Sequence, residues 1–159
     1  MKKYLLSLSF LFAALVSSAN TANFTSPNGK IKVDVNDNDG KISYTVSLGD
    51  NQFIAPSPLG LKLSYYSERD ASTPREINLA EGMKLDKTDL TVIDENYSVR
   101  SMKKSSVHYV ANKAMIAFTK DGKKAMDIEF RVSDTDVAFR GVLDTAQTGA
   151  DATRHLILE

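Results

Sequence analysis

Residues 107–143 read VHYVANKAMIAFTKDGKKAMDIEFRVSDTDVAFRGVL, and this stretch decides the fold class. Three segments within it alternate apolar and polar residues: 107–118, 126–132 and 137–143. A period of two is typical of strands that bury one face against a core. Asp121-Gly122 and the run 134–136 stand between the segments and are residues that tight turns prefer. The stretch therefore predicts three successive antiparallel strands.

The last two of these predicted strands combine apolar and basic residues. We expect four apolar side chains to pack in the core: Phe130, Val132, Val137 and Phe139. Arg131 and Arg140 fall at alternate positions, so we expect them to point outward or toward a partner. For both arginines a structural role is favoured over contact with a substrate.

The same alternation continues toward the amino terminus. Further strands are predicted at 31–35, 42–48, 53–54 and 59–66, with weaker signals at 83–94 and 97–102. The polar run 67–81 contains Pro74 and predicts a surface excursion. No segment has the pattern of an amphipathic helix. The chain is therefore predicted to be all-β and to form an antiparallel β-sandwich.

The stretch 33–46, VDVNDNDGKISYTV, is the first candidate for a metal site. A calcium loop of the EF-hand type needs Gly at position six to close the turn and Glu at position twelve to complete the ligand shell. With Asp34 as position one, Asp39 falls at position six and Thr45 at position twelve. The sequence therefore favours a hairpin turn around Asp39-Gly40 over a calcium loop.

Paired carboxylates are the second candidates, because an acid and a base from different strands are enough for glycoside hydrolysis. The visible pairs are Asp94-Glu95, Asp127 with Glu129, and Asp134 with Asp136. Asp127 and Glu129 alternate with apolar residues and are predicted to lie on the solvent face of their strand. Solvated carboxylates keep ordinary pKa values and make poor general acids. The sequence therefore predicts no catalytic residue.

Histidines and tyrosines are the remaining candidates for binding. His108 and His155 are far apart and lie in strand patterns, so a structural role is favoured over metal binding. The chain has no Trp. The tyrosines that could stack on a sugar ring are Tyr65, Tyr66, Tyr97 and Tyr109. Each is as well explained as a core residue with its hydroxyl at the rim, so no metal or cofactor ligand is predicted.

Residues 1–19 have the three-part layout of a secretory signal peptide. Lys2 and Lys3 form a positive head, residues 4–16 are apolar, and residues 17–19 supply small side chains for a cleavage site. The apolar run is shorter than the ~20 residues that span a bilayer. We therefore expect export without stable insertion in the membrane.

Cleavage is predicted after Ala19, with Ala22 as the alternative, which leaves residues 20–159 as one β-sandwich domain in the periplasm or outside the cell. Loss of the two lysines of residues 1–19 leaves 18 basic and 20 acidic residues, a net charge of −2. A chain this close to neutral has no broad electrostatic basis for binding nucleic acid. It also has no cysteine, so its stability depends on packing rather than on disulfides.

Several short motifs follow one another in a distinctive order. They are Ser26-Pro27-Asn28-Gly29, the segment 56–61 (PSPLGL), the segment 93–97 (IDENY), and Phe130-Arg131 followed by 136–140 (DVAFR). In this order and spacing they resemble the amino-terminal domain of glycoside hydrolase family 97. The resemblance covers residues 24–141, most of the chain.

The resemblance implies a large β-sandwich of the super-sandwich type, which in the family packs against a catalytic (β/α)₈ barrel. Family members hydrolyse α-glucosidic or α-galactosidic bonds in the periplasm of Gram-negative bacteria and use calcium. Their catalytic carboxylates lie on the barrel, and the calcium ligand of the amino-terminal domain is expected beyond Glu159. No position of this chain then inherits a catalytic, cofactor-binding or metal-binding role.

The expected function is that of a non-catalytic, exported sandwich domain. It would support a barrel in cis and wall one side of a pocket for an α-glucan or α-galactoside. The apolar run 154–159 ends the chain with nothing evident to pair with, so we expect the domain to be truncated, and incomplete at its C-terminus. The alternatives are a stand-alone periplasmic sandwich that binds carbohydrate or protein, and the product of a split or decayed gene.

Overall fold

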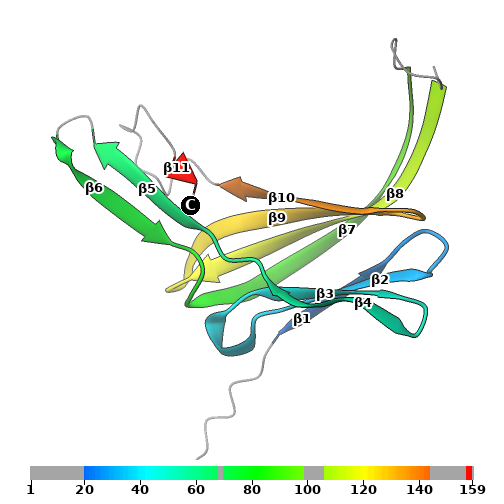
Figure 1. Ribbon diagram of the computed structural model, residues 1–159, viewed down its shortest axis with the longest axis horizontal. Coiled ribbons are helices and arrows are strands. Elements are labelled where there is room, and N and C mark those ends of the chain that lie inside the picture. The colour runs from blue at the N-terminus through cyan, green and yellow to red at the C-terminus, as the bar shows by residue number, and fades with distance from the viewer. Residues whose placement is uncertain (1–19, 68–69, 99–105, 144–156, 159) are drawn as a thin grey trace, which may run out of the picture.

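The computed structural model describes residues 20–67, 70–98, 106–143 and 157–158. Within these ranges the chain forms eleven strands, all paired antiparallel, and one 3-10 turn at Asn38–Gly40 (Figure 1). The described residues contain no α-helix. The predicted all-β class and antiparallel sandwich are confirmed, whereas the predicted signal segment 1–19 lies outside the described residues.

Two four-stranded sheets and one smaller sheet make up the fold. The first has the order β1-β2-β3-β4, with strands at Thr21–Thr25, Ile31–Asn36, Ser43–Leu48 and Asn51–Pro58. The second has the order β10-β9-β8-β7, with strands at Val137–Leu143, Lys123–Ser133, Ser106–Lys120 and Met83–Ser98. The third has the order β11-β5-β6, with strands at Ile157–Leu158, Lys62–Ser67 and Asp70–Asn78. In Figure 1 the β5–β6 hairpin extends away from the two larger sheets.

The core lies between the two four-stranded sheets and is organised around β9. Phe130 is fully buried, and its ring centroid lies 5.3 Å from that of Phe24 on β1 and 6.0 Å from that of Tyr44 on β3. The other inward positions of β9 are also buried: Met126, Ile128 and Val132. Burying one such side chain contributes roughly 1.5–3 kcal/mol. The inward face of β9 therefore holds the two sheets together.

The hairpins form where the sequence predicts them. Asp39 and Gly40 lie between β2 and β3 with φ values of 51° and 74°, and Asp121 and Gly122 lie between β8 and β9 with 51° and 73°. These left-handed conformations suit Gly, and Asp tolerates them better than most residues. The opening stretch 33–46 is thus a strand, a turn and a strand, as predicted.

Phe139 differs from the prediction that it packs in the core. It faces inward, and its ring centroid lies 5.4 Å from those of Tyr44 and Phe130. It is nevertheless 49% exposed, because β10 is the edge strand of its sheet and no other strand of the described ranges lies beside it. Val137 is partly buried against the core, as expected.

Two other predictions underestimate the length or the presence of edge strands. The polar run 67–81, predicted as a surface excursion, contains β6, which pairs with β5. The short strand predicted at 53–54 is part of β4, which continues through Pro56 and Pro58. An edge strand forms a ladder on one side only, so proline and polar residues are tolerated there. Periodicity and the presence of proline therefore underestimate strand content at sheet edges.

The predictions for residues 83–102 and for the run 154–159 also need correction. The signals at 83–94 and 97–102 belong to one strand as far as Ser98, because β7 runs unbroken along β8. Ile157 and Leu158 pair with Ser64 and Leu63 on β5. The expectation that the run 154–159 has nothing to pair with is therefore wrong for these two residues, and the rest of that run lies outside the described ranges.

The segment from β4 to β5 passes close to the segment after β6. The Leu59 N–H donates to the carbonyl oxygen of Ile42 at 3.0 Å, and the Leu79 N–H donates to that of Leu61 at 2.7 Å. Between them, a Cβ atom at Gly60 would lie 2.6 Å from the Cβ and 2.8 Å from the Cα of Ala80. Only glycine fits at this crossing without a shift of the backbone.

We predict that Gly60→Ala lowers the free energy of unfolding by about 1–3 kcal/mol, the usual cost of overpacking. The matched control is Gly141→Ala on β10, where an added Cβ has no atom within 4 Å and is expected to leave stability unchanged or raise it slightly. Urea unfolding followed by circular dichroism measures both. Equal stability of the two variants would contradict the close approach at Gly60.

Candidate functional site

The outer face of β9 and β10 carries a buried charge, Glu129. This residue is 3% exposed although it lies on the face that points away from the core. In the sheet register it stands directly opposite Met115 on β8 and Arg140 on β10. The sequence alternation predicted a solvated carboxylate here, and that prediction is wrong because neighbouring side chains on the same face cover it.

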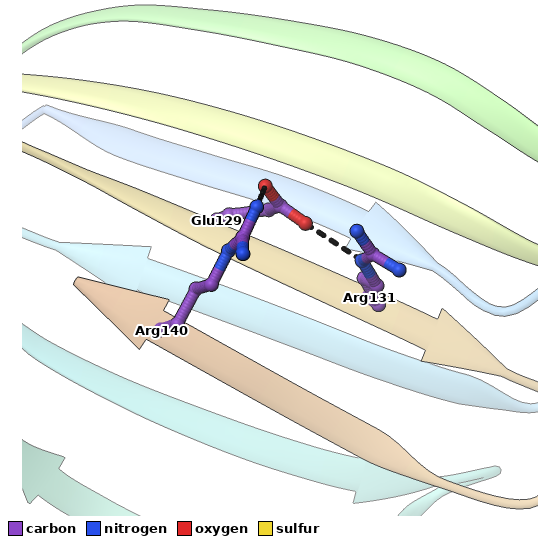
Figure 2. A network of polar contacts seen from close by, with 3 residues as sticks. All are labelled: Glu129, Arg131 and Arg140. Carbon is purple, nitrogen blue, oxygen red and sulfur yellow. Dashed lines mark hydrogen bonds and ion pairs between the residues drawn. The ribbon is translucent and has the colours of Figure 1, made fainter. Parts of the chain in front are cut away.

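Two arginines hold the Glu129 carboxylate (Figure 2). Arg131 Nε donates to Glu129 Oε1 at 2.6 Å, and Arg140 Nη2 donates to Glu129 Oε2 at 2.7 Å. Each carboxylate oxygen therefore has its own guanidinium partner. The arginine side chains are 40% and 66% exposed, so both remain on the outer face, as predicted. A hollow of about 200 Å³ lies over this Glu129–Arg131–Arg140 cluster.

The contacts in the cluster shift the pKa values of Glu129 and Arg131 in opposite directions. The hydrogen bond from Arg140 lowers the pKa of Glu129 below its ordinary value, and the bond from Arg131 adds to this against the effect of burial. The hydrogen bond to Glu129 raises the pKa of Arg131 above its ordinary value. The cluster consists of one carboxylate and two guanidinium groups, so its formal net charge is +1.

The geometry of this cluster suits binding better than proton transfer. A general acid needs a pKa near the working pH, and the pKa of Glu129 is displaced away from it. The fixed carboxylate instead orients two guanidinium groups whose remaining N–H groups are donors with no acceptor function. The arrangement suits recognition of carboxylates or of hydroxyl-bearing ligands.

Asp127 lies on the same outer face and is also more enclosed than predicted. Its side chain is 17% exposed, and its Oδ2 lies 2.8 Å from the Lys124 ammonium group. Its Oδ1 is buried and has no hydrogen-bond partner among the described residues. The two carboxylates of β9 are therefore held by different cations, and neither lies on an open solvent face.

Asp37, in the stretch that resembled a calcium loop, binds backbone N–H groups. Its Oδ1 accepts from the Asn20 N–H at 2.7 Å, and its Oδ2 accepts from the Leu85 N–H at 2.8 Å. The side chain is 7% exposed. Because Asn20 precedes β1 and Leu85 lies on β7, this carboxylate ties the first sheet to the second.

Asp134 and Asp136, in the turn between β9 and β10, accept hydrogen bonds from the Ser26–Gly29 turn and from Ser133. Asp134 Oδ1 accepts from the Asn28 N–H at 2.9 Å, which links the Ser26–Gly29 turn of the first sheet to the second sheet. Asp136 Oδ2 accepts from the Ser133 hydroxyl. This predicted pair is therefore engaged in structure.

The predicted histidine and tyrosine candidates do not gather at one place. His108 Nε2 lies 2.7 Å from Asp94 Oδ1, with both side chains more than half exposed, and such surface pairs contribute about 0–1 kcal/mol. Burial, followed by the charge of Asp136, raises the pKa of Tyr109. Tyr97 is 46% exposed. His155 and the side chains of Tyr65 and Tyr66 lie outside the described residues.

Two apolar grooves at the sandwich edges were missed by sequence reasoning. One, of about 360 Å³, runs between β4 and the β9–β10 turn, where Phe53 is 79% exposed and Leu48 52% exposed. The other, of about 430 Å³, lies between β1 and β7, where Leu90 is 59% exposed and Val92 70% exposed. Periodicity cannot distinguish these residues from core, because their exposure depends on which strands end each sheet.

Within the described ranges, no three His, Cys, Asp or Glu side chains gather in a way that could hold a metal ion. In the same ranges no helix is long and apolar enough to cross a membrane.

Residues 24–155 match the family described as glycosyl-hydrolase 97 N-terminal. A curated relative, the "Probable retaining alpha-galactosidase" of Streptomyces bingchenggensis (strain BCW-1), is 27% identical over 117 residues, which are 74% of this chain and 16% of that protein.

Two solved structures have a similar fold over most of this chain. A beta-arabinopyranosidase is 28% identical with a TM-score of 0.69, over 87% of this chain and 20% of that one. A glycoside hydrolase family 97 enzyme from Pseudoalteromonas sp. strain K8, in complex with acarbose, is 21% identical with a TM-score of 0.63, over 77% and 17% respectively. The chain therefore spans between 16% and 20% of the length of these relatives.

We predict that Glu129→Gln destabilises the fold near neutral pH by about 1–3 kcal/mol, the cost of weakening a buried charge-assisted hydrogen bond. Because the folded-state pKa of Glu129 is lowered, its contribution is complete above the unfolded glutamate pKa of about 4.3. The contribution is lost as the pH falls through the lower folded-state pKa.

Unfolding measured across this pH range is expected to show a smaller acid-induced loss of stability in Glu129→Gln than in the wild-type chain. The matched control is Glu81→Gln, because Glu81 is exposed. Parallel pH profiles for the wild type and Glu129→Gln would refute the role assigned to the cluster.

We further predict that Asp37→Ala lowers the free energy of unfolding by about 1.5–3 kcal/mol, because two backbone N–H groups lose a charged acceptor. Asp50→Ala, at an exposed turn position, is expected to change it by less than about 0.5 kcal/mol. Thermal unfolding compares the two variants, and an Asp37→Ala variant as stable as the control would exclude the tie between the sheets.

Proposed function

This chain belongs to the glycosyl-hydrolase 97 N-terminal family, and from this membership we propose that it is a non-catalytic, exported sandwich domain of a glycoside hydrolase. In this proposal the domain supports a separate catalytic domain in cis, a (β/α)₈ barrel, and forms one wall of its sugar pocket. The observation that carries the proposal is the Glu129–Arg131–Arg140 cluster on the outer face of β9 and β10.

The two faces of the second sheet support this division of labour. The inner face is occupied by the core, where Ile128 and Phe130 pack against the first sheet. The outer face presents the two guanidinium groups fixed by Glu129. Interfaces between domains of one chain are more polar than obligate interfaces. An outer face with charged groups held in place is better suited to contact a catalytic domain than to be buried in a second apolar core.

The proposal that this domain is not catalytic rests on the ion pairs and hydrogen bonds that hold its carboxylates. Glu129 is held ionised by two arginines, and Asp127 is paired with Lys124. Asp134 and Asp136 accept hydrogen bonds that hold their turn. Glycoside hydrolysis needs two carboxyl groups that can act on the substrate, whereas each of these four side chains is engaged by a cation or by a hydrogen-bond donor of this domain.

Export and substrate class are parts of the same proposal. Export is supported by the basic head, apolar run and small residues of residues 1–19. We propose an α-galactoside as the first substrate class to test for the assembled enzyme, because the curated relative is named as an α-galactosidase. An α-glucan is the second. Calcium, if the assembled enzyme uses it, is proposed to be bound by residues beyond this chain.

The test is a graft onto the Streptomyces relative. We expect that deleting its region equivalent to residues 24–155 abolishes hydrolysis of an aryl α-galactoside, and that replacing this region with the present chain restores part of it. The isolated chain is expected to hydrolyse neither aryl α-galactosides nor aryl α-glucosides. Arg140→Ala in the graft is expected to lower kcat/KM at least about tenfold, or ~1.4 kcal/mol.

The matched control in the graft is Lys41→Ala, an exposed cation in the turn region of the first sheet, which is expected to leave kcat/KM unchanged. Hydrolysis by the isolated chain would overturn the non-catalytic assignment. A graft in which Arg140→Ala and Lys41→Ala behave alike would overturn the assignment of the contact face.

A further inference from the structure

The outward edge of β7 has no strand beside it among the described residues. β7 runs from Met83 to Ser98 and pairs with β8 on its other side. At about 3.3 Å per residue its 16 residues extend over roughly 50 Å. A long unpaired edge offers backbone donors and acceptors to another strand. This edge is a ready interaction surface.

Two apolar residues at the middle of β7 face the inside of the sandwich but remain uncovered. Leu90 stands opposite Ala114 and Val92 opposite Asn112 in the register of β8. Ala114 is fully buried, whereas Leu90 and Val92 are 59% and 70% exposed. The first sheet ends at β1, so nothing described lies over them except the rim of the groove of about 430 Å³. They are core-facing positions over which no strand of the described residues lies.

Two kinds of residue pair are complementary when β7 is paired with a second copy of itself about Thr91. In an antiparallel pair of two β7 strands with Thr91 opposite Thr91, Leu90 faces Val92, and each such pair occurs twice by symmetry. In the same register Lys87, whose ammonium group lies 2.8 Å from Asp89 Oδ1 on the same strand, faces Glu95, again twice, and Asp89 faces Ile93. Even-numbered positions around the centre point inward and odd-numbered ones outward, so the apolar pairs meet inside and the charged pairs meet outside. Opposite charges and apolar pairs that face each other across strands stabilise strand pairing.

We propose that the chain forms a symmetric dimer in which β7 of one copy pairs antiparallel with β7 of a second copy. The two second sheets then form one continuous eight-stranded sheet. Leu90 and Val92 of both copies fill the space between the sandwich layers at the seam. A two-fold interface uses the same patch on both partners and so requires self-complementarity, which the Lys87–Glu95 and Leu90–Val92 pairs provide.

The dimer goes beyond the proposed function and leaves its site free. The Glu129–Arg131–Arg140 cluster lies on β9 and β10, at the opposite side of the same sheet from β7. Dimerisation and docking of a catalytic domain are therefore independent, and failure of one does not imply failure of the other.

The experiment is sedimentation equilibrium of the purified chain over the widest range of concentration at which it stays in solution. We expect a monomer–dimer equilibrium. The double variant Leu90→Lys/Val92→Lys is expected to be monomeric throughout, because four lysines would meet at the seam. The matched control is Leu48→Lys/Phe53→Lys, which changes two exposed apolar residues at the opposite edge and is expected to dimerise like the wild type.

Charge exchange tests the register without altering the apolar pairs. Lys87→Glu alone and Glu95→Lys alone are each expected to raise the dimer dissociation constant at least about tenfold, or ~1.4 kcal/mol. The combined variant Lys87→Glu/Glu95→Lys is expected to restore it. These positions are exposed, so the variants remain informative even if the lysine double variant fails to fold.

A chain that is monomeric at every concentration overturns the proposal. A dimer that survives Leu90→Lys/Val92→Lys, or one that is lost in the Leu48→Lys/Phe53→Lys control, also overturns it by placing the interface elsewhere. Failure of the combined charge exchange to restore the dissociation constant overturns the register about Thr91.

Discussion

The packing of β9 against the first sheet is the interaction on which the rest of the structure depends. Phe130 fills the space beside Phe24 and Tyr44, and the alternate residues of β9 continue the same buried row. Because successive side chains of a strand point to opposite faces, this row fixes where the residues between them lie. Glu129 and Arg131 are placed on the outer face as a direct consequence of burying Phe130.

Much of the fold could be predicted from the sequence because it depends on local patterns. The hairpin at Asp39-Gly40 and the three strands of residues 107–143 need only alternation and turn residues, and both are present in the structure. β6 could not be predicted in this way, since a polar run containing Pro74 carries no period of two. Its pairing with β5 is set by tertiary structure.

The sequence predicted which way the side chains of the candidate site point, but it did not predict that Glu129 is buried. Alternation placed Arg131 and Arg140 outward correctly, yet it also implied that Glu129 was solvated. The missing information was the register of β9 with β10. The predicted turn at 134–136 sets Val132 opposite Val137, and counting from that pair places Glu129 opposite Arg140. A carboxylate facing an arginine across a strand pair, with a second arginine two residues along, is a signal for a buried ionic cluster that single-strand periodicity does not contain.

The central claim is that the outer face of β9 and β10 contacts a catalytic domain while the inner face forms the core. The most direct test is a crystal structure of the grafted enzyme with a bound α-galactoside. The account predicts that the Arg140 guanidinium group, still held by Glu129, lies at the boundary between the sandwich and the catalytic domain, within hydrogen-bonding distance of that domain or of the sugar. A structure in which Arg140 points into solvent and the catalytic domain docks on the first sheet would contradict it.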